Sequence, residues 1–165
     1  EDLLKCVEAA RLAPSACNSQ PWSFIVVDAP DRVRDIGQKI FSGLYNMNRF
    51  AIEASALIVV ISEKQKFLSV LGGKIRDTRY YLIDIGIACE HLVLQAEELG
   101  IGSCWLGWFD EKALKAALSV PRDKKIDIVI ALGYAEGDAS SRPRIRKTLD
   151  EITSFDASRR TSCPK

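Results

Sequence analysis

The 165 residues suit one domain of ordinary size, large enough to bury a hydrophobic core without disulfides or a structural metal. Hydrophobic residues make up 47% and charged residues 27%, which is a globular composition, and 23 Lys+Arg against 22 Asp+Glu leave a net charge of +1. This balance gives no electrostatic case for a nucleic-acid or membrane partner.

The cysteine pattern argues against a metal site and against a disulfide framework. The five cysteines are odd in number and share no CxxC or CxH spacing, and three lie in apolar contexts, where cysteine behaves as a small hydrophobic residue. A reducing cytoplasm is therefore the expected compartment. No signal peptide is visible, although the chain begins at Glu1 without a Met. The cysteines are Cys6, Cys17, Cys89, Cys104 and Cys163.

The first part of the chain predicts two helices and two strands. The first helix must end before Pro14, because the residue before a proline is pushed out of the α region. The strand that follows reads as apolar enough to be covered on both faces. In order, we expect a helix at 2–13, a turn-rich run at 14–21, a strand at 22–27, a helix at 30–41 that a proline opens, and a strand at 56–61.

The second part predicts one long helix and two further strands. Asp110 has a residue type suited to cap a helix that follows it. A charged connection with two adjacent glycines precedes the long helix, and we interpret it as a partly helical, mobile cover. In order, we expect this connection at 63–79, the long helix at 80–99, a strand at 103–108, a helix at 110–118 and a strand at 126–132.

The long helix carries apolar residues around most of its circumference. Only Asp84, His91, Gln95 and Glu98 are expected to form a polar stripe along it. A helix of this kind is usually buried, and its several charges exclude a membrane span. In so small a domain, burial on most sides is easiest if a second subunit covers part of the helix.

The common catalytic arrangements are missing from the sequence. His91 is the one histidine, and its position in the middle of a helix favours a surface or packing role over catalysis. Any triad or dyad that needs a histidine would have to use it. No GxGxxG follows a strand, and no GxxxxGK[ST] exists. We therefore assign no catalytic residue.

Two polar clusters could bind a planar, anionic ligand. The first lies between Pro14 and Pro21, where amides and hydroxyls could read the edge of a flat heterocycle, or could simply form the turn. The second follows the last strand and could bind a phosphate, although such a run of charges alone is more often a solvated patch. The first cluster is Ser15, Asn18, Ser19 and Gln20; the second is Arg142, Arg144, Arg146 and Lys147.

Three segments in the same order resemble the nitroreductase family of flavoproteins. EAARLAPSACNSQPW at 8–22 is similar to the family's signature helix and loop. LGIGSCWLGW at 99–108 is similar to the exit of its central helix and its flavin-facing strand. ALGY at 131–134, with RIRKTLDEI at 144–152, resembles its last core strand and phosphate-binding tail. The resemblance covers residues 1 to about 152.

The resemblance implies a single FMN-binding domain spanning residues 1–165, with an α+β fold and a central mixed sheet of four or five strands flanked by helices. Two chains would form a homodimer through the long central helix, and each of two FMN sites would use residues from both chains. One chain would contribute Pro14, Ser15, Ala16, Asn18 and Gln20, and the other the Leu106–Gly107 backbone with Arg144, Arg146 and Lys147. Asn46 or Asn48 matches the family only loosely.

One departure from the family pattern concerns the phosphate. Family members usually carry an Arg-x-Ser-x-Arg segment upstream of the first helix, and this chain starts too late to contain it. Either that segment precedes Glu1, or the protein relies on its C-terminal cations alone to hold the FMN phosphate.

The activity that the resemblance implies is hydride transfer from NAD(P)H through FMN to a small acceptor, such as a nitroaromatic, a quinone or a free flavin, in a ping-pong cycle. Two alternatives stay open. One is a relative with different chemistry, either reductive dehalogenation or flavin destruction, on the same fold. The other is a protein that binds or sequesters flavin without catalysis.

Overall fold

The structure is a computed structural model that describes residues 1–63, 77–135 and 145–155. The chain divides into two units, residues 1–135 and residues 136–165, and each is described by itself. Most of the predicted cover at 63–79 lies outside the described residues. Within the described ranges, none of the helices is long and apolar enough to cross a membrane.

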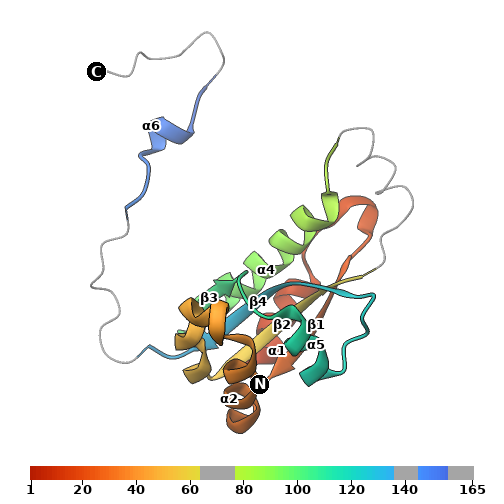
Figure 1. The fold of residues 1–165 in the computed structure, drawn as a ribbon. Helices are drawn as coiled ribbons and strands as arrows, with labels where there is room; N and C mark the ends of the chain where they lie inside the picture. Colours follow the sequence, from red (N-terminus) through yellow and green to blue (C-terminus); the bar gives the residue numbers. More distant parts are fainter. Residues whose placement is uncertain (64–76, 136–144, 156–165) are drawn as a thin grey trace. The chain divides into compact units, whose positions relative to one another are not determined.

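The first unit alternates helices with strands along the chain (Figure 1), and the predicted elements are present with small shifts at their ends. Asp110 caps α5 as expected, because its side chain accepts a hydrogen bond from the Ala113 backbone N–H at 2.9 Å. The elements are α1 (Asp2–Arg11), η1 (Ala16–Asn18), β1 (Trp22–Val27), α2 (Pro30–Ile40), η2 (Gly43–Glu53), β2 (Ala56–Ser62), α4 (Tyr80–Glu98), β3 (Gly102–Leu106), α5 (Glu111–Leu118) and β4 (Lys125–Gly133).

The four strands form one sheet in the order β1-β2-β4-β3, and all three pairings are antiparallel. The α+β class is confirmed, but the expectation of a mixed sheet is wrong for the strands that the structure describes. Two helical segments, α2 and η2, lie in the chain between β1 and β2, which pair as antiparallel neighbours. β2 and β3 point in the same direction but do not pair, because β4 lies between them.

The core lies on both faces of this sheet, because successive residues of a strand point to opposite sides. On one face, Leu57 and Val59 of β2 pack among buried residues of α2 and α5, such as Ile36 and Leu114. On the other face, Ile58 joins α1 and α4, with Cys6, Cys89 and Leu92 among the buried residues. Cys6 and Cys89 thus serve as core side chains, and burial raises the pKa of Cys89 to about 12.

β1 is less buried than its composition predicts. It lies at an edge of the sheet, and every residue from Trp22 to Val26 is only partly buried. Trp22 and Phe24 pack toward the α1–α4 face and Ile25 toward the other, so both faces are in use. The outer edge of the strand has no neighbour among the described residues of this chain, and this accounts for its exposure.

α4 is buried along one face and exposed along another. Ile85, Cys89 and Leu92 are at most 4% exposed, whereas Ile83 and Leu94 are 52% and 59% exposed. The predicted polar stripe is wrong at one position, because Asp84 is only 4% exposed. An apolar face that this chain leaves uncovered agrees with the expectation of a second subunit without establishing it.

The second unit contains one described helix, the short α6 (Leu149–Ile152). A capping box closes its first turn: the Thr148 backbone N–H donates to the Glu151 carboxylate at 2.7 Å, and the Thr148 hydroxyl does so at 3.1 Å. Every described residue from 145 to 155 is exposed.

Candidate functional site

The loop between Pro14 and Pro21 adopts an unusual backbone conformation. Cys17, Asn18 and Gln20 have φ angles of 54°, 50° and 46°, in the left-handed region that residues with a Cβ rarely occupy. For Cys17 and Gln20 this conformation costs on the order of 1–2 kcal/mol each, whereas asparagine adopts it more readily. Backbone strain of this kind persists only where the surroundings hold it, and it is often found at ligand sites.

Local hydrogen bonds hold the loop in this shape. The Gln20 backbone N–H donates to the Ser15 hydroxyl at 2.9 Å, which closes the loop across five residues. The Gln20 side-chain amide donates to the Asn18 Oδ1 at 2.8 Å, so two of the predicted site residues are paired with each other. The Asn18 and Ser19 backbone N–H groups donate to the Ser15 and Ala16 carbonyls.

A buried carboxylate anchors the start of the loop. Asp84, in the first turns of α4, accepts a hydrogen bond from the Ala16 backbone N–H at 3.0 Å and one from the Ser19 hydroxyl at 3.5 Å. It is the one charged residue that is buried among those the structure describes. This role was not predicted from the sequence. Asp84 stands four residues before the buried Ala88, and an acid on an apolar helix face indicates a carboxylate that hydrogen-bond donors satisfy.

The other end of the loop is fixed to β2. The Glu63 backbone N–H donates to the Pro21 carbonyl at 3.0 Å, and its carboxylate accepts from the Ser23 hydroxyl at 2.7 Å and from Lys124. The hydrogen bonds from Lys124 and Ser23 lower the pKa of Glu63. The predicted loop is therefore held at both ends by residues far from it in the sequence.

The second predicted segment, Leu106–Gly107, leaves the end of β3. The Leu106 side chain is buried in the core, so only its backbone is available to a ligand. Gly107 is exposed, and a Cβ placed there would meet only the Ile128 side chain, at 3.9 Å. A flat ligand can thus approach the backbone of Gly107 closely, as the resemblance implies.

Contacts with η2 fix the residue after Gly107. The Trp108 indole N–H donates to the Leu44 carbonyl at 2.9 Å, and the Asn48 amide donates to the Trp108 carbonyl at 2.8 Å. The rings of Trp108 and Tyr45 lie 5.3 Å apart. Asn48, which matched the family only loosely, therefore positions the turn that contains Gly107.

The strand register places the loop and Gly107 toward the same end of the sheet but at opposite edges. Trp22, directly after the loop, is level with Ser62 and Lys125, whereas Leu106 pairs with Val129 on the far side of β4. Three strand spacings separate β1 from β3, which is roughly 14 Å. The two predicted segments of one chain are therefore not adjacent.

A β-bulge in β4 presents a carboxylate that the sequence analysis did not single out. Asp127 has no partner residue in the register, because Ile61 pairs with Ile126 and Val60 with Ile128. Its carboxylate accepts a hydrogen bond from the Ser62 hydroxyl. Burial raises the pKa of Asp127 despite that bond.

The basic cluster belongs to the second unit. Arg142 and Arg144 lie outside the described residues, whereas Arg146 and Lys147 are described and exposed. The Arg146 guanidinium donates to the carbonyl of Ile145 at 3.0 Å, one residue away. These two cations are accessible to an anion, and the described contacts do not orient them toward one.

A cavity of about 630 Å³ adjoins the predicted loop. It lies between α1 and the start of β1, its walls are largely apolar, and Gln20 provides an amide. Arg11 and Glu8 line the cavity, and the Arg11 guanidinium donates two hydrogen bonds to the Glu8 carboxylate, both at 2.6 Å. Its lining residues are Leu4, Val7, Glu8, Arg11, Gln20, Trp22 and Phe24.

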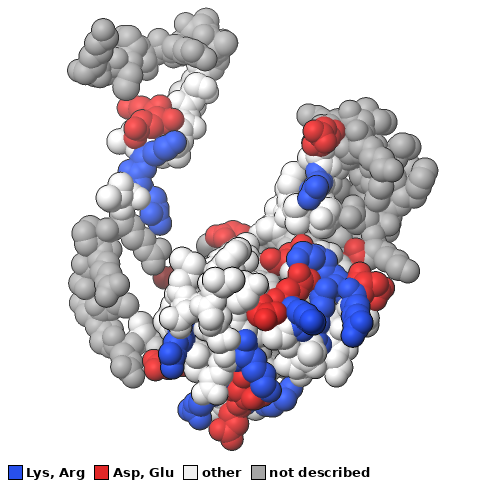
Figure 2. Space-filling model, viewed as in Figure 1, with Lys and Arg blue, Asp and Glu red and all other residues white. Residues whose placement is uncertain are grey.

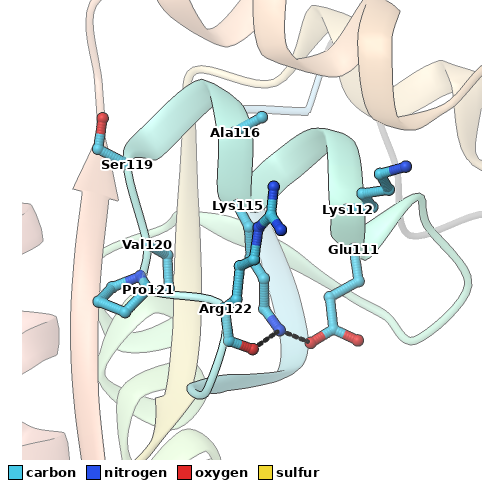
Figure 3. A pocket seen from close by; sticks show the side chains of 8 residues that line it. All are labelled: Glu111, Lys112, Lys115, Ala116, Ser119, Val120, Pro121 and Arg122. Atoms are coloured by element: carbon cyan, nitrogen blue, oxygen red, sulfur yellow. Dashed lines mark hydrogen bonds and ion pairs between the residues drawn. The ribbon is translucent and has the colours of Figure 1, made fainter.

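A larger cavity, of about 700 Å³, lies on α5 (Figure 3) and contains none of the predicted ligand residues. Figure 3 shows the Lys115 ammonium between the Glu111 carboxylate, at 2.9 Å, and the Arg122 carbonyl, at 3.4 Å. Burial opposes ionisation of Glu111, but hydrogen bonds from Lys125 and Lys115 outweigh it and lower its pKa to about 2. Because its central cation is already paired, this cavity is a weaker candidate for an anionic ligand.

Charged side chains of both signs are interspersed on the face in Figure 2, whereas the surface over η2 is largely uncharged. Three large apolar side chains of η2 and that of Trp108, which contacts η2, are each more than half exposed. We call them the η2 surface: Leu44, Met47, Phe50 and Trp108. An apolar area of this kind beside Gly107 is typical of an interaction site.

Comparison with known proteins identifies the family of the chain. The model of the nitroreductase family matches residues 1–134, which include the loop, Asp84 and Gly107. A protein of Archaeoglobus fulgidus, provisionally named as an NADH dehydrogenase/NAD(P)H nitroreductase, is 36% identical over 144 residues, covering 84% of this chain and 75% of the relative.

Two further relatives differ in their named activities. A solved structure of an FMN-dependent nitroreductase from Clostridium difficile has a TM-score of 0.68 and 26% identity, covering 94% of this chain and 86% of that one. An iodotyrosine deiodinase of Thermotoga neapolitana is 24% identical over 164 residues, covering 87% of this chain and 82% of the relative.

Proposed function

Because the chain belongs to the nitroreductase family, we propose that it is an FMN-dependent oxidoreductase that accepts hydride from NAD(P)H and passes it to a small acceptor, such as a nitroaromatic, a quinone or a free flavin. The observation that carries the proposal is the match over residues 1–134, in which the loop at 14–21 is already shaped and anchored. The named activities of the nitroreductase relatives support it.

The described residues suit the flavin that this function needs. The loop offers amides and hydroxyls that can pair with the polar edge of the ring, and the exposed Gly107 has no Cβ to hold the ring away. Arg146 and Lys147 are proposed to bind the phosphate by charge-assisted hydrogen bonds. When bound, FMN would supply the hydride chemistry, with donor and acceptor using the site in turn.

No residue of the chain is needed as an acid or base for hydride transfer itself, so the proposal requires no catalytic constellation. The protein would orient the ring and limit access of water to it. The two proposed ring contacts are separate in one chain, because β2 and β4 lie between the strands that carry them. This separation supports a site that takes the loop from one chain and Gly107 from the other.

We also propose that two chains form a homodimer through α4. The exposed Ile83 and Leu94 provide an uncovered apolar face on the helix, and a stable interface of the obligate class buries at least about 2,000 Å². Ile83→Asp with Leu94→Asp should shift the protein from dimer to monomer in light scattering at micromolar concentration. Ala116→Asp, on the exposed side of α5, is the control. A wild-type protein that is a stable monomer would refute the dimer.

The activity is tested first by the absorbance spectrum of the purified protein and then by steady-state oxidation of NADH or NADPH with a nitroaromatic or a quinone. We expect a bound flavin and turnover with at least one acceptor. A bound flavin without turnover under any of these conditions would favour the sequestering protein instead. Absence of flavin binding after addition of FMN would overturn the proposal.

Reductive dehalogenation is the second candidate, because a deiodinase is among the relatives. An iodinated phenol offered to the reduced protein under anaerobic conditions separates the two activities. Release of iodide faster than reduction of the nitroaromatic would favour the dehalogenase.

A further inference from the structure

We infer that Asp84 is a positioning residue, which from the first turns of α4 holds residues 15–20 in the shape that receives the flavin. The inference rests on the proposed function for its ligand and on the contacts of Asp84 for its mechanism. Asp84 would not touch the flavin, and its effect would pass through the loop backbone.

The contacts of Asp84 divide between the two halves of the loop. Oδ1 accepts from the Ala16 backbone N–H at 3.0 Å, and Oδ2 accepts from the Ser19 hydroxyl at 3.5 Å. One carboxylate therefore spans Cys17 and Asn18, two of the residues with positive φ. A group that holds the chain on both sides of a strained segment limits its return to a relaxed conformation.

Burial makes these hydrogen bonds stronger and their loss more serious. Asp84 is 4% exposed, so water cannot easily replace either loop donor. The other hydrogen bonds that shape the loop, from Gln20 to Ser15 and to Asn18, lie among exposed atoms, where water competes. Asp84 thus restrains the inside of the loop from a buried position on α4.

This anchor also explains why an acid is present on the buried face of α4. Its neighbours on that face, Ile85, Ala88 and Cys89, are apolar and at most 4% exposed. A carboxylate among them is costly unless donors satisfy it, and Ala16 and Ser19 are those donors. A role in general packing would be served as well by an apolar side chain.

The test uses three substitutions in the full-length protein and one matched control. Asp84→Ala removes both acceptors, Asp84→Asn keeps the size and an acceptor oxygen, and Ser19→Ala removes one donor only. Glu111→Ala is the control, because Glu111 also accepts a backbone N–H of a separate element, from Ile126 at 3.1 Å, but lies on α5. Each variant is measured for FMN and riboflavin dissociation constants, apoprotein Tm and amide hydrogen exchange at Ala16.

We expect Asp84→Ala to weaken FMN and riboflavin equally, by at least tenfold, and to speed hydrogen exchange at Ala16. Asp84→Asn should restore flavin affinity to within about threefold of wild type. The flavin affinity of Ser19→Ala should lie between those of the two Asp84 variants. This variant therefore keeps the test decisive if Asp84→Ala does not fold. Glu111→Ala should lower the Tm without changing the flavin dissociation constants.

Unchanged flavin affinity in folded Asp84→Ala would overturn the inference. If Asp84→Ala does not fold, unchanged flavin affinity in Ser19→Ala would overturn it, and so would unchanged hydrogen exchange at Ala16 in either variant. Failure of the proposed function is distinguishable. If the wild-type protein binds no flavin, the function fails, while exchange at Ala16 in the same variants still decides whether Asp84 holds the loop.

Discussion

The loop at 14–21 and the tail at 145–155 carry the two polar clusters proposed to bind FMN, and their own surroundings differ. The loop is strained, closed by its own hydrogen bonds and anchored by Asp84 and Glu63. The tail is exposed throughout its described residues, and its one described cation contact is that of Arg146 with a neighbouring carbonyl. We therefore expect the loop to recognise the shape of the ligand and the tail to supply charge.

The largest expected effect tests the tail. The double substitution Arg146→Ala with Lys147→Ala should raise the FMN dissociation constant roughly a hundredfold, because two charge-assisted hydrogen bonds to the phosphate would be lost. Riboflavin lacks the phosphate and should bind both proteins equally. Fluorescence titration of the apoprotein with each flavin measures the difference.

The control for the tail removes two cations elsewhere. Arg34→Ala with Lys39→Ala changes the net charge equally on α2, where both cations pair with aspartates of the same helix. This variant should bind FMN as the wild type does. An equal loss of FMN affinity in both double variants would mean that the tail acts only through net charge.

A smaller effect is expected from the loop. Asn18→Asp keeps the oxygen that accepts from Gln20 at 2.8 Å, so the loop should retain its shape, but it replaces amide donors with a negative charge. Flavin affinity should fall roughly tenfold, and FMN and riboflavin should weaken alike. The apoprotein Tm should barely change.

Gln38→Glu is the matched control for the loop, because it makes the same chemical change at an exposed position of α2. It should leave both flavin affinities unaltered. If Asn18→Asp lowers the Tm but leaves flavin affinity intact, Asn18 shapes the turn and does not recognise the ring.

The smallest effect is the response to salt. Raising the ionic strength from about 50 mM to about 500 mM should weaken FMN binding by about threefold, because salt screens exposed charges such as those of Arg146 and Lys147. Riboflavin should change by less than half of that, because it depends on the loop. Equal responses of the two flavins would contradict a division of labour between loop and tail.

The sequence predicted the elements well because their signals are local. The β-branched run at 56–61, the proline before the loop and the cap at Asp110 each act on the chain within a few residues, and all three are present. The direction of strand pairing was not predictable in this way, because it depends on β4 entering between two strands made earlier.

The residue types of the candidate site were predictable from the sequence, but their arrangement in space was not. The loop residues follow a recognisable pattern, but positive φ at Cys17 and Gln20 could not be read from residues that rarely adopt it. By helical position Asp84 could belong to the apolar face of α4 or to the polar stripe. Its hydrogen bond with Ala16 in the structure assigns it to the buried face. The roles of the loop residues, of Leu106 and Gly107 and of the tail cations in binding all stay predictions.

The strand order has a consequence for synthesis on the ribosome. β4 is the last strand of the first unit to be translated, yet it pairs with both β2 and β3 at the centre of the sheet. Until Gly133 has left the exit tunnel, the apolar run of β2 has no neighbour on one edge. We expect completion of the sheet to await the emergence of β4 and to be slow, because its central pairings join distant parts of the chain. A polypeptide released before β4 would expose the edge of β2, a site at which other nascent chains can aggregate.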